Sequence, residues 1–342
     1  MNDHKKLKER DLGIHFQTWR DQMNDMANTS ESTDPNIIVS ILDPLIFGIE
    51  GIKPDEKLLA TWSQEQLDII SKIDSNDNFQ KPIKYIAGIS ICFDTNDTDV
   101  RACISIYNYQ TIKLVAVFSI EGKMFVPYVP GYLAFREVPL LMKLLKEIED
   151  KYLELLPQVI IADGCGIWHP RSCGMASNLS ILSGIPCIGV SKHIFDVENI
   201  TTEFITRIMT GSVAGSFVDV VTASNKTIGT CFNVGGVTNR TVYISVGSHI
   251  SLKSAKEIVS HMCQYQNNGI IRMADNITRL LMAVKDPYIV KAQPNCSNWA
   301  SSTPTVVYSQ EERDEFEQLC KEARKKFKGM SMDLSCLLHE ED

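Results

Sequence analysis

Three acidic residues occupy positions from which they could act together on a phosphate ester. Glu137 follows a proline-rich loop and begins an apolar run, and Asp163 ends the buried stretch PQVIIAD. Asp275 lies in the late segment MADNITRLL. Hydrolysis of a phosphodiester with Mg²⁺ requires carboxylates from separate elements that converge on the metal, which activates water and stabilises the leaving oxygen. These residues are therefore the candidate catalytic acids.

Each acid also has an ordinary structural explanation. Asp163 precedes a Gly-Cys-Gly turn that its side chain could cap, and Glu137 could be a first-turn acid favoured by the helix dipole. Together the two acids favour a catalytic role, because ligands of open α/β sheets bind where the strands end. A second acid on a neighbouring helix would meet Asp163 there.

The elements that must position these acids follow from hydrophobic periodicity. An apolar-periodic helix begins near residue 56, and Trp62 and Leu67 are among the residues that recur on its apolar face. Three strand-like runs follow it: KYIAGISICF, VRACISIYNY and TIKLVAVFSI. A helix over 136–152, the strand PQVIIAD, a helix over 173–183 and the strand PCIGVS come next, and later strands and helices end in MADNITRLLMAV. This order predicts an α/β fold: a mixed sheet with a three-strand antiparallel meander, then parallel strands, and helices on both faces.

The chain divides into three parts. Residues 1–55 are predicted to be an N-terminal extension containing the linker-like ANTSESTDPN, and residues 56–290 the core domain. Residues 291–342 are predicted to be a tail with one amphipathic helix, from Ser309 to about Lys328, whose capping box is Ser309 and Glu312. We expect this helix to dock on the core.

Composition restricts the class of protein. The net charge is −8, so the chain is not a general nucleic-acid coat, and nucleic-acid binding must come from a local site or a bound metal. Ten cysteines occur without a C-x-x-C pair, which indicates buried thiols in a reducing compartment. The polar N-terminus is no secretory signal, and the early apolar run is interrupted by Asp43-Pro44. We predict a soluble cytoplasmic or nuclear protein with no membrane partner.

Five collinear motifs make the chain similar to the endonuclease V family: YVPGYLAFRE, ADGCGIWHPRSCGMAS, CIGVSKHIF, YISVGSHISLKSA and MAD. The resemblance covers about residues 58–285. It implies a ribonuclease H-like fold and Mg²⁺- or Mn²⁺-dependent cleavage of nucleic acid. The cut would lie one phosphodiester beyond the 3′ side of a deaminated purine, usually inosine, and leave 5′-phosphate ends.

The resemblance also assigns roles to residues. Glu137 and Asp163 match metal-binding carboxylates, Asp275 lies where a further late acid is found, and Lys192 matches a basic residue near the scissile phosphate. A wedge that stands beside a flipped base is matched by Pro127, Tyr128, Val129 and Pro130. The pocket for the base is matched by Gly131, Leu133, Gly164, Gly166, His169 and Phe195. Considered alone, His169 is more simply a core histidine, so the surrounding motif carries its assignment.

Two positions depart from the family pattern. Ser90 stands where the first strand should carry a metal-binding aspartate, and a serine hydroxyl is a weak, neutral Mg²⁺ ligand. Asp94 shares its face of the strand but lies roughly 13 Å away, and Asp97 and Asp99 are predicted in the hairpin loop. His249, whose role is uncertain, follows Ser248 and is one place later than the family histidine, so we interpret it as a second change at the chemical centre.

Three hypotheses follow. The protein is an active endonuclease whose metal site tolerates Ser90 through water or Glu137, or it binds inosine-containing nucleic acid without cutting it. In the third hypothesis the extensions and tail helix make it an interaction scaffold with a vestigial pocket. The sequence leaves open whether the nucleic acid is DNA or RNA.

Overall fold

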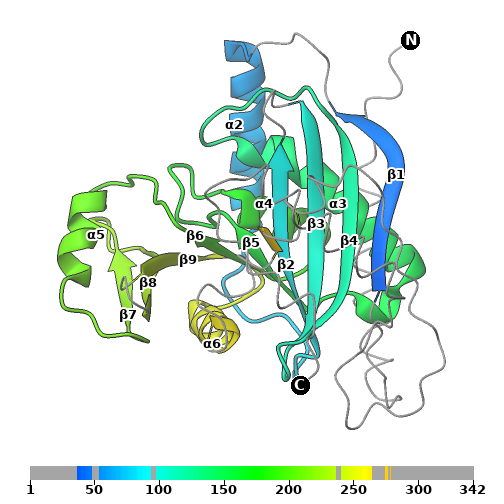
Figure 1. Cartoon of the computed structure of the whole chain (residues 1–342). Helices are drawn as coiled ribbons and strands as arrows, with labels where there is room; N and C mark the ends of the chain where they lie inside the picture. Colours follow the sequence, from blue (N-terminus) through cyan, green and yellow to red (C-terminus); the bar gives the residue numbers. More distant parts are fainter. Residues whose placement is uncertain are drawn as a thin grey trace, which may run out of the picture.

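The computed structural model contains one mixed nine-stranded sheet with helices on both faces (Figure 1). It describes residues 54–93, 98–235, 240–263, 274, 275 and 278, and the backbone of 37–47. The strand order is β1-β4-β3-β2-β5-β6-β9-β8-β7. The strands are β1 Ile37–Phe47, β2 Tyr85–Phe93, β3 Asp99–Asn108, β4 Leu114–Met124, β5 Val159–Asp163, β6 Cys187–Ser191, β7 Phe217–Val221, β8 Thr227–Gly235 and β9 Arg240–Ser248.

The centre of the sheet has the predicted arrangement. Strands β2, β3 and β4 form an antiparallel meander, and β5 and β6 continue from β2 in parallel. Strands β9, β8 and β7 then run antiparallel, and with the nearby helix α5 (Thr202–Met209) they project from the main body (Figure 1). Strand β1 pairs in parallel with β4, so residues 37–47 of the predicted N-terminal extension belong to the sheet.

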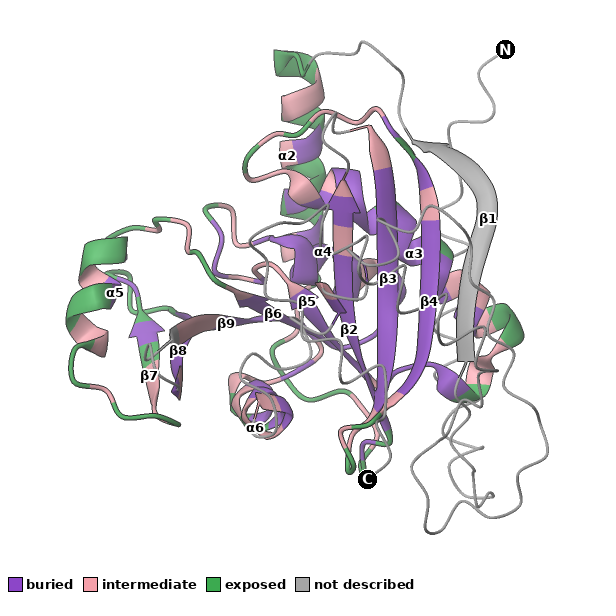
Figure 2. Ribbon diagram, in the orientation of Figure 1, coloured by how far each residue is buried: buried purple, intermediate pink, exposed green. Residues whose placement is uncertain are grey.

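The central strands of the sheet are largely buried (Figure 2). Their side chains alternate between two cores, one on each face of the sheet. Helices α3 (Leu133–Lys151) and α4 (Met175–Ser183) cover one face, where they pack with Ile89 and Ala162. Helix α6 (Leu252–Cys263) covers the other face, where it packs with Ile86 and Ile161. Because side chains alternate along a strand, Ser90 and Asp163 belong to the α6 face.

Helix α2 (Glu56–Ile70) begins where the sequence predicts, because the Asp55 side chain accepts a hydrogen bond from the Leu58 N–H at 2.8 Å. Helix α3 begins at Leu133, three residues before the predicted start. A short 3-10 turn, Leu153–Leu155, follows it. The predicted tail helix lies outside the described residues.

The described cysteines agree with the prediction of free, mostly buried thiols. Cys92, Cys103, Cys187 and Cys231 are buried within the sheet, and no cysteine among the described residues forms a disulfide. Burial raises the pKa of the Cys103 thiol to about 11, so it stays protonated. In the part of the chain that the structure describes, no helix is long and apolar enough to cross a bilayer.

Candidate functional site

The sheet brings Ser90 and Asp163 side by side. In the parallel pair of β2 and β5, Ile89 is the partner of Ala162, and Ser90 and Asp163 are the next residues of the two strands. Neighbouring strands lie about 4.8 Å apart, so the two Cα atoms are separated by about that distance. Ser90 is 4% exposed and Asp163 is half-buried, which leaves the carboxylate accessible at the end of its strand.

Asp275 approaches the same face of the sheet. Its Oδ1 atom lies 3.9 Å from the Sγ atom of Cys92, which is two residues after Ser90 on β2 and therefore on the same face. Asp94 and Asp97 lie outside the described residues. Asp99 was predicted in the hairpin loop, but it is the first residue of β3. Asp163 is thus adjacent to Ser90 on the neighbouring strand, and Asp275 lies further along the same face, beside Cys92.

Glu137 approaches from α3. The side chain is 9% exposed, and its pKa is raised to about 8, first by burial and then by the negative charge of Asp163. The neighbouring Arg136 guanidinium opposes the shift, and it lies over the Phe93 ring at 4.0 Å. Glu137 is therefore close enough to Asp163 for their charges to interact, and it holds a proton at neutral pH in the absence of a cation.

These oxygen donors fit Mg²⁺ or Mn²⁺ in their chemistry. Hard divalent cations prefer carboxylate oxygens, and a cation would offset both the burial of Glu137 and the Asp163 charge, which together raise the Glu137 pKa. The described residues contain no group of three or more His, Cys, Asp and Glu side chains already arranged to hold a metal ion. The chemistry of these donors thus suits such a cation, and Ser90 places a hydroxyl beside Asp163 where a carboxylate would add charge.

The proline-tyrosine loop presents an aromatic side chain to solvent. Tyr128 is 60% exposed and Pro130 is also exposed, whereas Pro127 and Val129 are half-buried. Gly131 ends the loop at φ +81°, and a Cβ atom there would meet the Arg171 Nη2 atom at 2.9 Å. The left-handed backbone favours glycine at this position, and a larger residue would also have to displace the Arg171 guanidinium.

His169 lies against this loop as a neutral ring. It is 2% exposed, and its Nδ1 atom accepts the Arg171 N–H at 3.1 Å, so the ring proton is on Nε2. Its pKa is lowered to about 4, first by burial and then by the Arg171 charge, while a hydrogen bond with the Gly131 backbone opposes the shift. The Phe195 ring contacts it edge-on, with centroids 5.1 Å apart.

The other predicted site residues lie close to this edge of the sheet. Leu133 is the first residue of α3, and Lys192 is exposed immediately after β6, whose Val190 pairs with Asp163. The two glycines after Asp163 differ in role. Gly164 has φ +153°, a backbone conformation that residues with side chains rarely adopt. At Gly166 the constraint is space, because a Cβ atom there would come within 2.0 Å of the Val246 carbonyl oxygen. Gly166 therefore permits the site loop to pack directly on β9.

Ser248 and His249 lie elsewhere, which differs from our interpretation of the sequence. Strand β9 runs antiparallel to β6, so Ser248 pairs with Cys187, whereas Asp163 pairs with Val190 at the other end of β6. Three residues of β-strand separate the two ends by roughly 10 Å. The Ser248 Oγ atom accepts the Asp74 N–H at 2.9 Å, and thus anchors the loop before β2 rather than joining the acids.

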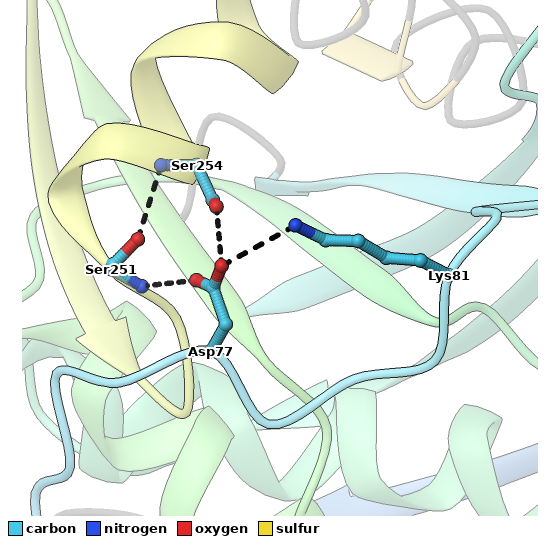
Figure 3. Close-up of polar contacts among 4 residues, drawn as sticks. All are labelled: Asp77, Lys81, Ser251 and Ser254. Carbon is cyan, nitrogen blue, oxygen red and sulfur yellow. Dashed lines mark hydrogen bonds and ion pairs between the residues drawn. The ribbon is translucent and has the colours of Figure 1, made fainter.

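The same loop anchors α6. Asp77 accepts the Ser251 N–H at 2.8 Å and the Ser254 hydroxyl at 2.6 Å, and Lys81 lies 3.5 Å from its carboxylate (Figure 3). A carboxylate at this end satisfies N–H groups that the helix leaves unpaired. The polar residues around His249 therefore have a structural explanation.

Two residues beside the proline-tyrosine loop, Gln66 and Arg171, were not predicted as site residues from the sequence. Gln66 is 1% exposed, although Leu67, which the apolar pattern placed inside, is 54% exposed. Arg171 lies within the motif ADGCGIWHPRSCGMAS and donates to the Gly131 carbonyl at 2.7 Å. Gln66 could have been identified from its position four residues after Trp62, which places the two side chains on the same face of the helix.

Comparisons with known proteins agree on one family. The Endonuclease V family model matches residues 68–276. Endonuclease V of Mus musculus is 31% identical over 234 residues, covering 65% of this chain and 69% of that protein. The human protein is 30% identical over 238 residues, covering 66% and 84% respectively.

Solved structures show the same architecture. The crystal structure of the catalytic domain of human Endonuclease V has a TM-score of 0.63 at 27% identity, covering 67% of this chain and 97% of that one. Ciona intestinalis Endonuclease V, solved with a 24mer DNA containing an inosine followed by a ribo-adenosine, has a TM-score of 0.61 at 26% identity, covering 66% and 98%. The predicted ribonuclease H-like mixed sheet is confirmed.

Proposed function

Because this chain belongs to the endonuclease V family, we propose that it acts on nucleic acid containing a deaminated purine, with inosine as the base it selects. The observation that carries this proposal is the position of the exposed Tyr128 loop beside neutral, buried His169, at the edge where Asp163 ends its strand. A stiff aromatic loop can occupy the space that a flipped base leaves. The Ciona relative solved with inosine-containing DNA supports the same ligand class.

For cleavage, Glu137, Asp163 and Asp275 would hold Mg²⁺ or Mn²⁺. A bound cation of this kind supplies an activated water and stabilises the leaving oxygen. Glu137 must lose its proton to serve as a ligand, because burial and Asp163 raise its pKa to about 8. Lys192, exposed after β6, can pair with a backbone phosphate.

A second candidate function is inosine binding without cleavage. It is favoured by Ser90, which lies beside Asp163 and removes one negative charge from the proposed metal site. The loop and the pocket do not depend on that charge. Such a protein would read inosine and leave the phosphodiester intact.

One experiment separates these functions. Single-stranded RNA and DNA oligonucleotides carrying one inosine, with adenosine controls, are incubated with Mg²⁺ or Mn²⁺ and with wild type, Glu137→Ala or Ser90→Asp. Both binding and cleavage are measured. Cleavage by the wild type that is lost in Glu137→Ala would establish an enzyme.

The other outcomes are equally informative. Inosine-selective binding without cleavage, together with cutting gained in Ser90→Asp, would establish a reader. No preference for inosine over adenosine in either assay would refute both functions and leave the scaffold hypothesis. Comparison of the RNA and DNA substrates decides which nucleic acid is preferred.

A further inference from the structure

Gln66 joins α2 to two segments of the proposed base pocket. Its Nε2 atom donates to the Gly131 carbonyl and to the Cys173 carbonyl, both at 3.0 Å, and its Oε1 atom accepts Arg171 Nε at 2.5 Å. The side chain is 1% exposed, and every polar hydrogen and the oxygen acceptor are used. A buried amide with this full set of partners is costly to replace, because any apolar substitute leaves those partners unpaired.

The Gly131 carbonyl is the meeting point of this network. It accepts hydrogen bonds from Gln66 and from Arg171 Nη2, the latter at 2.7 Å, and His169 also has a hydrogen bond with the Gly131 backbone. Gly131 ends the loop that presents Tyr128. The position of one carbonyl therefore couples the exposed aromatic loop to the buried histidine.

Aromatic contacts fix the same helix to the start of α3. The Trp62 ring stacks on the Phe135 ring at 5.1 Å with an interplanar angle of 4°. Ser63 shares a 2.7 Å hydrogen bond with the Tyr132 hydroxyl, and the Arg171 guanidinium lies 4.0 Å over the Tyr132 ring. Helix α2 thus contacts both ends of the turn that leads into the helix carrying Glu137.

We propose that Gln66 is a positioning residue that holds the 126–132 loop and Arg171 in one arrangement, and so sets the geometry in which a flipped base is selected. The selection part of this inference rests on the proposed function. The positioning part rests on the contacts alone. Gln66 is suited to the task because a single planar amide supplies donors to two carbonyls and an acceptor to a guanidinium.

Two substitutions of Gln66 remove different sets of its hydrogen bonds. Gln66→Met keeps the length and volume but removes all three hydrogen bonds. Gln66→Glu keeps an acceptor for Arg171, yet it loses both N–H donors and turns a carboxylate oxygen toward the Gly131 and Cys173 carbonyls. Gln64→Met is the matched control, since Gln64 lies on the exposed side of α2 and donates a 3.0 Å hydrogen bond to Asp68 on the same helix.

The first readout is amide hydrogen exchange of the full-length protein. We expect peptides covering 126–135 to exchange at least tenfold faster in Gln66→Met and Gln66→Glu, with β7 and β8 peptides unchanged. The Gln64→Met control should match the wild type. Unchanged exchange of the 126–135 peptides in both Gln66 variants would overturn the proposal.

The second readout is the ratio of dissociation constants for adenosine- and inosine-containing RNA. We expect this ratio to fall at least tenfold in both Gln66 variants and to stay constant in Gln64→Met. If the wild type lacks an inosine preference while the loop still loosens, positioning is supported and the proposed function fails. If the wild type prefers inosine and the loosened variants keep that preference, the selection role is refuted.

Discussion

Replacement of Ser90 by aspartate tests whether this residue stands beside the acids, as the β2–β5 register indicates. The new carboxylate would lie on the strand next to Asp163, on the same face of the sheet. The Glu137 pKa is already raised, first by burial and then by the negative charge of Asp163. We therefore expect Ser90→Asp to be unfavourable in the metal-free protein and favourable once a divalent cation is bound.

The magnitude follows from Coulomb's law. Two like charges about 5 Å apart repel by roughly 3 kcal/mol at an effective dielectric constant of about 20. At pH 8 the metal-free variant should lose about that much stability, or avoid part of it by taking up a proton. For a domain of this size the loss corresponds to a fall in Tm on the order of 10 °C.

Thermal unfolding at pH 8, with chelator and then with Mg²⁺, measures both effects. Ser90→Asn is the matched control, because it has nearly the volume of aspartate without its charge. We expect Mg²⁺ to raise the Tm of Ser90→Asp more than that of the wild type or of Ser90→Asn, since metal binding stabilises the folded state by mass action. Equal metal-free stability of the two variants, with equal Mg²⁺ responses, would refute the proposed arrangement.

Three further predictions concern neighbouring groups. Because the folded-state pKa of Glu137 is raised to about 8, metal-free stability should fall as pH rises from about 4.5 through 8, and Glu137→Gln should flatten this fall in pH-dependent denaturant unfolding. The pKa of His169, lowered to about 4, gives the opposite pH dependence. Its contribution to stability, about 3 kcal/mol, is complete above pH 6.5 and is lost as pH falls toward 4. We therefore expect His169→Gln to remove that part of the acid sensitivity in the same titration. Ser248→Ala should lower stability by about 1 kcal/mol through the lost Asp74 contact, yet leave inosine affinity unchanged in a binding titration; a loss of affinity would place the residue in the site after all.

The sequence contained enough information for the central sheet because local patterns specify it. Three runs rich in apolar and β-branched residues predicted the meander, and Asp163 at the end of its strand followed from the buried PQVIIAD segment. The proline-rich loop and its exposed Tyr128 were equally local features. Cys92, Cys103, Cys187 and Cys231 could be placed in the core because each lies singly within an apolar run.

Pairing between distant segments was decided only by the tertiary structure. Apolar periodicity predicted Leu67 inside α2, but Gln66 is buried instead, because the Gly131 and Cys173 carbonyls and Arg171 supply partners that no local pattern reveals. Hydrophobicity alone cannot anticipate a buried amide whose partners lie 65 or more positions away in the chain.

The same limit applies to the proposed site. Because His249 lies one place later than the family histidine, the sequence suggested a change at the chemical centre. The antiparallel direction of β9 instead carries this segment to the far end of β6. The distance of Ser90 from Asp163 likewise depends on which strands pair and in what register. Residue types determined which groups could take part in chemistry, and strand direction and register determined which of them meet, because those depend on contacts across the whole sheet.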